Sequence, residues 1–316
     1  MFNAGRRSAF SGKLMIDDAI TIRKLEVLLA FMEHSKLTQA SEVLGQSAVS
    51  VHRALHSLEE GLRCPLFKRM GRNLVPLPAA YTFANYARRA LSEVELGVRK
   101  AREVAGLDDV RLKVGCLYSL TLRCIPRLIN GLKERRPELH LDLTMGSNRE
   151  LYLGLMEGRL DAAVVGVDAQ RQDSSWLTIP LFDDQLHLAA PADSPYQNAG
   201  PVDLNAMRHE QFVRLSDDFS TAENFDYAFA QAGYQPRIAL SVSEIFSLIN
   251  LVSGGIGYSL LPGRVGDFSP RMALLPLAPR YRVRQQVGLL FPRSRERDAN
   301  LLALAAECRM YQRAAA

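Results

Sequence analysis

Apolar residues recur every three or four positions between residues 22 and 32, a spacing that predicts an amphipathic helix. They are Ile22, Leu25, Leu28, Leu29 and Met32. A second, short helix is expected behind Thr38 as its N-cap, and Gly45 is expected to end it. Its inward-facing residues are expected to be Ala40, Val43 and Leu44. With the helix that follows, these runs predict a helix-turn-helix.

A third helix is predicted behind Ser47, which can act as its N-cap. Its buried stripe is expected to consist of Val51, Leu55, Leu58 and Leu62. A rotation of about 100° per residue places Val49, Arg53 and His56 on the opposite face. An exposed valine near an arginine suits the DNA major groove, where an aliphatic group can touch a thymine methyl and arginine reaches guanine. The alternative is an ordinary solvated helix surface.

A basic turn follows at residues 68–73, between an apolar segment at 65–67 and a short predicted strand at Leu74 and Val75. A tight basic hairpin beside a recognition helix is typical of a wing, which contacts phosphates or the adjacent minor groove. Pro76 and Pro78 are expected to end this hairpin.

A proline-free, helix-favouring stretch runs from Ala79 to about Ala105, and it predicts a helix about 40 Å long. Its apolar stripe comprises Ala84, Ala87, Ala90, Leu91, Val94, Val98 and Ala101. Since a small winged module cannot cover so long a stripe, we expect a second copy of the chain to cover the rest.

From Arg111 onward, short β-rich runs alternate with helical ones, which predicts an α/β body with parallel sheets and right-handed crossovers. Strands are expected at 112–116, 139–145, 161–167, 185–190, 212–215, 237–242, 256–261 and 286–291, with helices at 120–135 and 149–157 among others. Leu139, Leu141 and Leu143 alternate with polar residues, so we expect them to share one face.

The composition adds an uneven charge distribution. The 316 residues are 47% hydrophobic and carry a formal net charge of +5. Residues 20–90 contain ten basic and five acidic side chains, whereas residues 111–316 contain 23 basic and 22 acidic ones. A basic helix-turn-helix on a neutral body indicates double-stranded DNA as its partner. The residues expected to contact DNA are Thr38, Ser47, Ala48, Val49, Ser50, His52, Arg53, His56, Arg69 and Arg72.

The chain contains no window near the roughly 18 to 20 apolar residues of a membrane span, and its N-terminus lacks the apolar core of a signal peptide. We therefore expect a cytoplasmic protein with no membrane partner. Residues 1–20 are expected to form a flexible extension, with translation starting at Met15.

These segments resemble the LysR-type transcriptional regulators over nearly the whole chain. The signature parts are SAVSVHRALHSLE at 47–59, EGLRCPLFKR at 60–69, and Gly71 with Arg72. Within the family, the chain most resembles the members that control malonate utilisation. The segments that carry this resemblance are VHRALHSLEEG, CPLF, GRNL, LYSLTL, RRPEL, LDLTMGSN, LLPGR and NLLALAAECRMY. The chain departs from the family pattern at Ala48 and Val49 (usually Gln and Pro), at His52 (usually Ser) and at Leu77 (usually Thr). The operator half-site therefore need not be the usual one.

The resemblance implies a multidomain protein. It implies an all-α winged helix-turn-helix domain at 21–78, a linker and dimerisation helix at 79–108, and an α/β effector-binding domain at 109–316. That last domain would have two lobes, like a periplasmic binding protein, with one at about 109–181 and 283–316 and the other at about 182–282. The implied partners are further copies of the chain in a homodimer or homotetramer, a small carboxylate effector (malonate or a relative) and, if the protein activates transcription, RNA polymerase. The implied function is control of a catabolic operon.

In such an architecture, ligands bind between the lobes at the carboxyl ends of strands. Several strand-to-helix joints carry hydroxyl or amide residues, and free backbone N–H groups at helix N-termini there would hold a carboxylate; each joint also fits a plain N-cap. The expected effector-binding residues are Tyr118, Ser119, Leu120, Thr121, Ser147, Asn148, Ser216, Ser220, Thr221, Ser243 and Arg264. Arg264 is either a bidentate carboxylate ligand or a surface arginine.

The sequence supports other functions less well. The sequence has no catalytic motif, so we expect neither an enzyme nor a cofactor. His140, His187 and His209 lack ligand spacing, so no metal is expected. A redox-sensing regulator of the same family would use Cys116 and Cys124 as a switch. A solute-binding transport protein would share the two lobes but should carry a signal peptide and no winged module.

Overall fold

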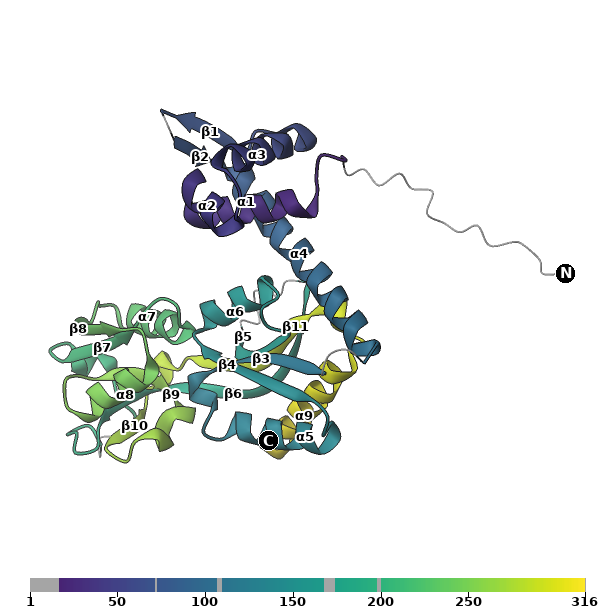
Figure 1. Ribbon diagram of the computed structural model, residues 1–316. Coiled ribbons are helices and arrows are strands. Elements are labelled where there is room, and N and C mark those ends of the chain that lie inside the picture. The colour runs from purple at the N-terminus through teal and green to yellow at the C-terminus, as the bar shows by residue number, and fades with distance from the viewer. Residues whose placement is uncertain (1–16, 72, 107–109, 168–173, 198–199, 316) are drawn as a thin grey trace. The chain divides into compact units, whose positions relative to one another are not determined.

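The computed structural model describes residues 17–71, 73–106, 110–167, 174–197 and 200–315 (Figure 1). Most of the expected N-terminal extension, including Met15, lies outside these residues. The chain divides into two compact units, Met1–Ala101 and Arg102–Ala316. In the described part of the chain, no helix has both the length and the apolarity needed to cross a membrane.

The first unit contains three short helices, a hairpin and most of a long helix. The elements are α1 (Ile22–His34), α2 (Leu37–Leu44), α3 (Ala48–Leu62), β1 (Phe67–Met70), β2 (Asn73–Pro76) and α4 (Pro78–Val104). The Ser47 hydroxyl caps α3 by accepting the Ser50 N–H at 3.1 Å, and Gly45 ends α2 at φ +62°. Val51, Leu55 and Leu58 on α3 are buried, which confirms the predicted stripe for these three residues; Leu62 is half-buried.

Helix α2 differs from its prediction in two ways. It begins at Leu37 behind Lys36, whose side chain makes no capping bond, so Thr38 is a residue of its first turn and not its N-cap. Val43 is 66% exposed because the inward stripe runs through Leu37, Ala40, Ser41 and Leu44. The prediction that Val43 faces inward was therefore wrong, because α2 is rotated about its axis relative to the orientation that was expected.

The hairpin of β1 and β2 is antiparallel, with Phe67 opposite Pro76 and Met70 opposite Asn73. Lys68 and Arg69 lie in strand β1 and not in the turn, so the turn is tighter than expected. Helix α4 begins at Pro78. Its alanines Ala80, Ala84 and Ala87 complete the core of this unit, whereas Val94 and Val98 are 46% and 57% exposed.

The second unit is an α/β structure with one large sheet and one small one. Its strands are β3 (Arg111–Leu117), β4 (His140–Gly146), β5 (Ala162–Val167), β6 (Trp176–Pro191), β7 (Gln211–Leu215), β8 (Arg237–Val242), β9 (Ser259–Pro262), β10 (Met272–Pro276) and β11 (Arg284–Pro292). Its helices are α5 (Cys124–Arg135), α6 (Asn148–Met156), α7 (Ser220–Ala232), α8 (Ile245–Ser253) and α9 (Ala299–Ala315), with short 3₁₀ helices at Tyr118–Leu120, Leu204–Met207, Gly263–Phe268, Pro279–Tyr281 and Arg293–Arg295.

The expectation of purely parallel sheets was wrong. The large sheet has the order β10-β6-β11-β5-β3-β4, with β9 also on β6. Its β4-β3-β5 part is parallel, but β11 runs antiparallel to both β5 and β6, and β9 and β10 run antiparallel to β6. The two-stranded β7-β8 sheet is parallel. Alternation of strands and helices along the chain does not reveal that β6 and β11 return through the sheet in opposite directions.

One local expectation was confirmed and another failed. Leu141 and Leu143 line the same small cavity with Val114 and Leu128, so they share a face, although Leu143 is 36% exposed on the edge strand β4. The expected helix from Leu120 is interrupted, and α5 begins at Cys124. Pro126 explains the break, since in a continuous helix its ring would clash with the carbonyl four residues earlier.

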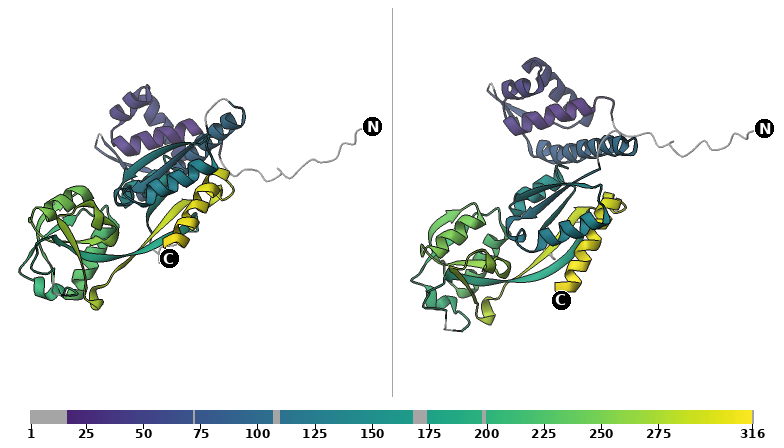
Figure 2. Two further views of the ribbon diagram at one scale, coloured as in Figure 1. Left: turned by 90° about the horizontal axis from the view of Figure 1, so that it is seen from below. Right: turned by 60° about the horizontal axis from the view of Figure 1, so that its bottom comes forward.

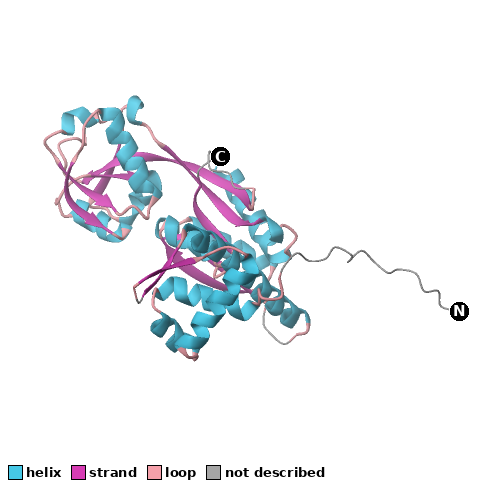
Figure 3. Ribbon diagram, turned by 90° about the horizontal axis from the view of Figure 1, so that it is seen from above, coloured by secondary structure: helices cyan, strands magenta, loops and turns pink. Residues whose placement is uncertain are grey.

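The second unit has two lobes, each with its own core. One core gathers β3, β5, α5, α6 and α9, and the other is built from two clusters around α7 and α8. Strands β6 and β11 pass side by side from one lobe to the other (Figure 2), and they stand out as the two long strands in Figure 3. Along β6, Phe182 packs on the first core and Leu186 in the second; along β11 and its approach, Val283 belongs to the second and Val287 to the first.

Candidate DNA-binding surface and inter-lobe site

The outward face of α3 carries the predicted DNA-contacting side chains. Val49 is 60% exposed, and Ser50, His52 and Arg53 are exposed beside it. His56, one turn further along, is exposed and has its Nδ1 3.3 Å from the Glu60 carboxylate. Ala48 is half-buried, and Thr38 on α2 and Ser47 are exposed. The helix thus presents an aliphatic group, hydroxyls and a guanidinium on one surface.

Ser47 and Ser50 are joined to each other at the start of α3. Their Oγ atoms lie 2.9 Å apart, and the Ser47 Oγ also accepts the Ser50 N–H. Only one of the two hydroxyl hydrogens is needed for the bond between them. The other can be donated to a phosphate or a base edge.

The hairpin contributes further cations. Lys68 and Arg69 are exposed on β1, and Met70 beside them is 57% exposed. Gly71 takes a φ of +62°, a conformation that allows the tight turn between β1 and β2. Arg72, the remaining predicted wing residue, lies outside the described residues.

Other basic residues of this unit hold the fold together. The Lys24 ammonium donates to the Ala19 carbonyl at 2.7 Å and to the Ser57 hydroxyl at 2.8 Å, and it thereby fixes α1 to α3. Arg23 pairs with Glu26 at 2.7 Å. The charge count overestimates the cations that can reach DNA, because it does not separate such internal partners from surface ones.

A polar cluster lies where the two lobes of the second unit meet. Asn148 at the start of α6, Ser220 at the start of α7 and Gln285 on β11 form this inter-lobe cluster. The Asn148 Oδ1 accepts the Ser220 hydroxyl at 3.1 Å, and the Gln285 amide donates to the Ser220 Oγ at 2.6 Å. The Asn148 amide donates to the Gly166 carbonyl at 3.2 Å. A Cβ at Gly166 would lie 2.9 Å from the Ser220 Oγ, so the cluster packs on glycine backbone.

Two buried polar atoms in this region have no hydrogen-bond partner: the Gln285 Oε1 and the Ser216 Oγ. Ser216 follows β7, four residues before Ser220. Since buried polar atoms are nearly always bonded, an unpaired acceptor and an unpaired hydroxyl are features that a small polar ligand would satisfy.

Arg264 already has a carboxylate partner within the protein. Its Nη1 lies 3.0 Å from the Asp184 Oδ2, and its Nε donates to the Ser119 Oγ at 2.9 Å. Asp184 also accepts the backbone N–H groups of Gly263 and Arg264. Burial lowers the pKa of the Arg264 guanidinium, and Asp184 opposes that effect. Arg264 is therefore not the surface arginine of the alternative interpretation; it holds Ser119, across the lobes, from a nearly buried position.

The remaining predicted effector residues are in different situations. The Ser147 hydroxyl is used in a capping box with Glu150, and Leu120 is 2% exposed within the first lobe's core. Ser243 is exposed and precedes α8, whose N-cap is Glu244, so its hydroxyl is not an N-cap. Thr221 is buried in α7.

Thr121 and Tyr118 lie where the first lobe meets the second. The Thr121 hydroxyl donates to the Tyr118 carbonyl, and the Tyr118 ring packs edge-on against Phe246 of the other lobe with the ring centroids 6.2 Å apart.

Two further contacts join the lobes. Arg149 pairs with Asp218 by side chain at 3.3 Å and by backbone at 3.1 Å, and Arg123 pairs with Asp267. Asp184, Asp218 and Gln285 were not among the predicted residues. Their partners lie between 65 and 80 residues away in sequence, and no local pattern marks them.

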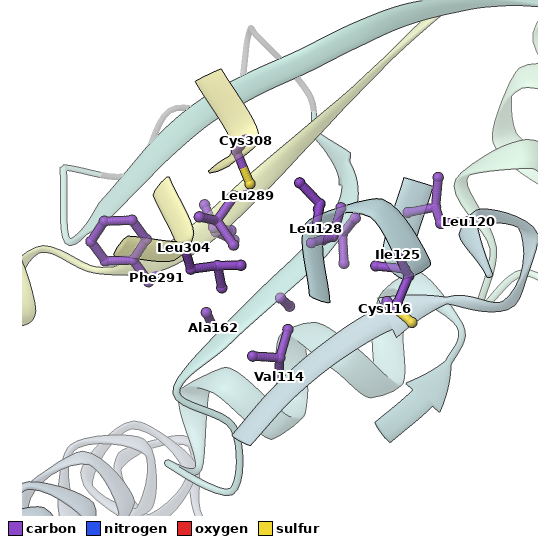
Figure 4. Packing of buried hydrophobic residues seen from close by; sticks show 14 of the residues in the cluster. Val114, Cys116, Leu120, Ile125, Leu128, Ala162, Leu289, Phe291, Leu304 and Cys308 are labelled. Carbon is purple, nitrogen blue, oxygen red and sulfur yellow. The ribbon is translucent and has the colours of Figure 1, made fainter. Parts of the chain in front are cut away.

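Cys116, Cys124 and Cys308 are buried in the core of the first lobe. Figure 4 shows Cys116 and Cys308 among the apolar side chains of that core. Burial raises the pKa of the Cys116 and Cys124 thiols to about 12 and also raises that of Cys308. These thiols stay protonated, and a protonated thiol is a poor nucleophile. The arrangement does not favour the redox-switch alternative. Within the described residues, no group of three or more His, Cys, Asp or Glu side chains is placed to bind a metal ion.

The fold and its two candidate sites define a class of protein: a DNA-binding regulator with a winged helix-turn-helix and a two-lobed ligand-binding domain. Residues 22–81 match the bacterial regulatory helix-turn-helix of the lysR family, and residues 105–313 match the LysR substrate binding domain. The chain belongs to the LysR family of transcriptional regulators. The family thus combines a regulatory helix-turn-helix with a substrate-binding domain.

Relatives cover most of the chain. It is 45% identical over 300 residues to the malonate utilization transcriptional regulator of Klebsiella pneumoniae, covering 94% of this chain and 97% of that protein. Among solved structures, CbnR complexed with its target DNA matches with a TM-score of 0.61 and 20% identity, over 92% of this chain and 100% of that one. OxyR of Pseudomonas aeruginosa matches with a TM-score of 0.60 and 21% identity, over 92% and 95%. The sequence-based assignment to the family and the fold class are confirmed.

Proposed function

We propose that this LysR-type regulator binds a small carboxylate, malonate or a close relative, between the two lobes and controls a catabolic operon in response. The observation that carries the proposal is the pair of unpaired buried atoms, the Gln285 Oε1 and the Ser216 Oγ, beside hydrogen bonds that join the lobes. The relative from Klebsiella pneumoniae, named for malonate utilization, supports the choice of effector.

Polar groups of the inter-lobe site can hold a carboxylate without a free lysine. The Ser119 Oγ accepts from Arg264, so the Ser119 hydroxyl hydrogen is left for a ligand oxygen. Ser216 and Ser220 offer further hydroxyls, and a water molecule bound with the carboxylate would donate to the Gln285 Oε1. Tyr118, Thr121, Asn148 and Thr221 complete the proposed site, in which Leu120 takes part through its backbone alone. For Ser147 and Ser243 we propose supporting roles at their helix starts.

We further propose that Thr38, Ser47, Ala48, Val49, Ser50, His52, Arg53, His56 and Arg69 form the DNA surface. Two such surfaces in a dimer would read the two half-sites of a pseudo-palindrome. The exposed part of α4 around Val94 and Val98 would pack on a second copy, in a dimer or tetramer. If the protein activates, RNA polymerase is a further partner. The site of action would be the cytoplasm, with no catalytic step.

Isothermal titration of the purified full-length chain with malonate, acetate, succinate and glutarate tests the effector assignment. Malonate is expected to bind and to raise the melting temperature in proportion to the logarithm of its concentration. Binding of none of these acids would contradict the proposal, and preference for another acid would correct the effector. A Gln285→Ala variant that titrates malonate like the wild type would show that the site lies elsewhere.

A further inference from the structure

Glu59 lies on α3, and its carboxylate bonds the first residues of the wing. The Glu59 Oε1 accepts the backbone N–H of Leu66 at 2.8 Å and that of Phe67 at 3.0 Å. Glu59 is half-buried, whereas Arg53 and Val49 on the same helix are exposed. One carboxylate therefore joins the recognition helix to the strand that carries the wing cations.

The chain between α3 and β1 needs such a restraint. Arg63, the C-cap of α3, takes a φ of +50°, so the backbone turns sharply there. Leu77 donates its backbone N–H to the Leu66 carbonyl at 2.8 Å, so Phe67 and Pro76 form a non-hydrogen-bonded pair of the antiparallel hairpin. The Phe67 N–H therefore points away from β2 and is free to be bound by Glu59, and the Phe67 ring packs edge-on against Phe31 with the ring centroids 5.2 Å apart.

Lys68 and Arg69 follow directly after the two residues that Glu59 holds. Because successive strand residues keep fixed directions, anchoring Leu66 and Phe67 fixes where these cations project. We propose that Glu59 is a positioning residue for DNA binding: its carboxylate sets the wing so that Lys68 and Arg69 reach phosphates while α3 occupies the groove. The inference rests on the DNA surface proposed above and adds a residue that does not itself touch DNA.

A purely stabilising role for Glu59 would give a different result from a positioning role. If Glu59 only stabilises the module, its loss lowers the melting temperature but leaves the DNA contacts of the folded protein intact. If it positions the wing, the folded variant loses the wing's phosphate contacts selectively. The dependence of operator affinity on salt separates the two roles, since its slope counts neutralised phosphates.

The test uses the full-length protein and the duplex that the wild type enriches from a random-sequence library. Glu59→Ala is compared with Glu59→Gln, which keeps the accepting oxygen, and with Glu33→Ala, which removes an exposed acid of α1 and makes the same charge change. We expect Glu59→Ala to lose at least about tenfold in affinity and to lower the salt slope by about two per subunit, one for each of the two wing cations of that subunit. Glu59→Gln and Glu33→Ala are expected to bind with the wild-type slope.

A mutant cycle makes the result specific to the wing. In the Glu59→Ala background, adding Lys68→Ala and Arg69→Ala should cost almost nothing more, whereas adding Arg53→Ala should cost its full single-variant effect. A wild-type salt slope for folded Glu59→Ala, or full additivity with the wing changes, would overturn the proposal. If Glu59→Ala does not fold, Glu59→Asp replaces it, because the carboxylate is one methylene shorter. Wild-type affinity of Arg53→Ala would instead contradict the DNA surface itself.

Discussion

The two candidate sites differ in how far their polar groups are already bonded. On α3, Val49, His52 and Arg53 face outward, with Val49 60% exposed. At the lobe junction, Asn148 and Gln285 are 9% and 5% exposed and are bonded through Ser220. A DNA-binding surface can remain exposed to solvent because water satisfies the hydrogen bonds of its polar groups until a duplex displaces that water. A buried site for a small ligand must rearrange bonds within the protein when the ligand enters.

This difference links effector binding to lobe geometry. Any ligand that takes the Ser220 hydroxyl or the Gln285 amide competes with bonds that connect the lobes. Its affinity then differs between lobe arrangements, which is the condition for a ligand to shift their equilibrium. Coupling free energies of this kind are typically about 1–3 kcal/mol.

The largest effect is expected from salt, and it should separate the two sites. Operator affinity should fall by about a thousandfold or more between 50 and 200 mM salt if about six or more phosphates are neutralised per dimer. Malonate affinity should change far less, because its proposed ligands are mostly neutral. Fluorescence anisotropy with the enriched duplex and calorimetry with malonate measure the two slopes. A flat operator slope would argue against a basic docking surface.

Replacement of Arg53 by alanine should come next in size. It is expected to weaken operator binding by about 1–3 kcal/mol and to leave malonate binding unchanged. Arg53→Lys keeps the charge but not the bidentate geometry, so it should recover the salt slope and little of the specificity. Wild-type operator affinity in Arg53→Ala would mean that α3 docks differently.

Much of the exposed face of α3, on which the proposed DNA surface depends, could be predicted because helical periodicity is local. Once Ser47 fixed the start of α3, the positions of Val51, Leu55 and Leu58 followed from the spacing. The same reasoning misplaced Thr38 and Val43, because an eight-residue helix offers too few apolar positions to fix its rotation. Glu59 was counted as an acid of the basic module, and its role became visible only with the backbone N–H groups of Leu66 and Phe67 in place.

Ser147 and Ser119 provide a comparison within the second unit. Ser147→Ala removes a capping box, so it should cost about 1 kcal/mol of unfolding free energy, measured by urea denaturation. Ser119→Ala should instead reduce malonate affinity by the loss of one hydrogen bond, about 0.5–1.5 kcal/mol. The opposite pattern, with Ser147→Ala affecting malonate affinity alone, would mean that the Ser147 hydroxyl binds the ligand and does not act as a cap.

The inter-lobe site could be predicted only in part, for a physical reason. Strand-to-helix joints mark Asn148 and Ser220, but their bond spans 72 residues, and that of Arg264 with Ser119 spans 145. A side chain near the start of a helix can cap that helix, as Ser147 does, or bond a residue of the other lobe, as Asn148 does. Tertiary packing decides between these outcomes.

The smallest effect is expected from oxidation. Treatment with mild peroxide followed by mass spectrometry should leave Cys116 and Cys124 unbridged, whereas the exposed Cys64 reacts with thiol reagents. In the folded chain the pKa of both buried thiols rises from 9.0 to about 12. The contribution of these neutral thiols to the free energy of unfolding is therefore fully present below pH 9, and it is lost as the pH rises toward 12. A Cys116–Cys124 bridge in native protein would contradict this account.

The paired strands β6 and β11 have a mechanical consequence for the second unit. Their register shifts between Val287 and Gly288, where a Cβ added to Gly288 would lie only 3.0 Å from the Ile179 carbonyl oxygen. A continuous hydrogen-bonded ribbon resists bending more than a flexible tether does, so relative movement of the two lobes is expected as torsion of limited amplitude in the part of the ribbon between that bulge and the second lobe. We therefore expect an effector to move the lobes by small displacements that reverse when it dissociates.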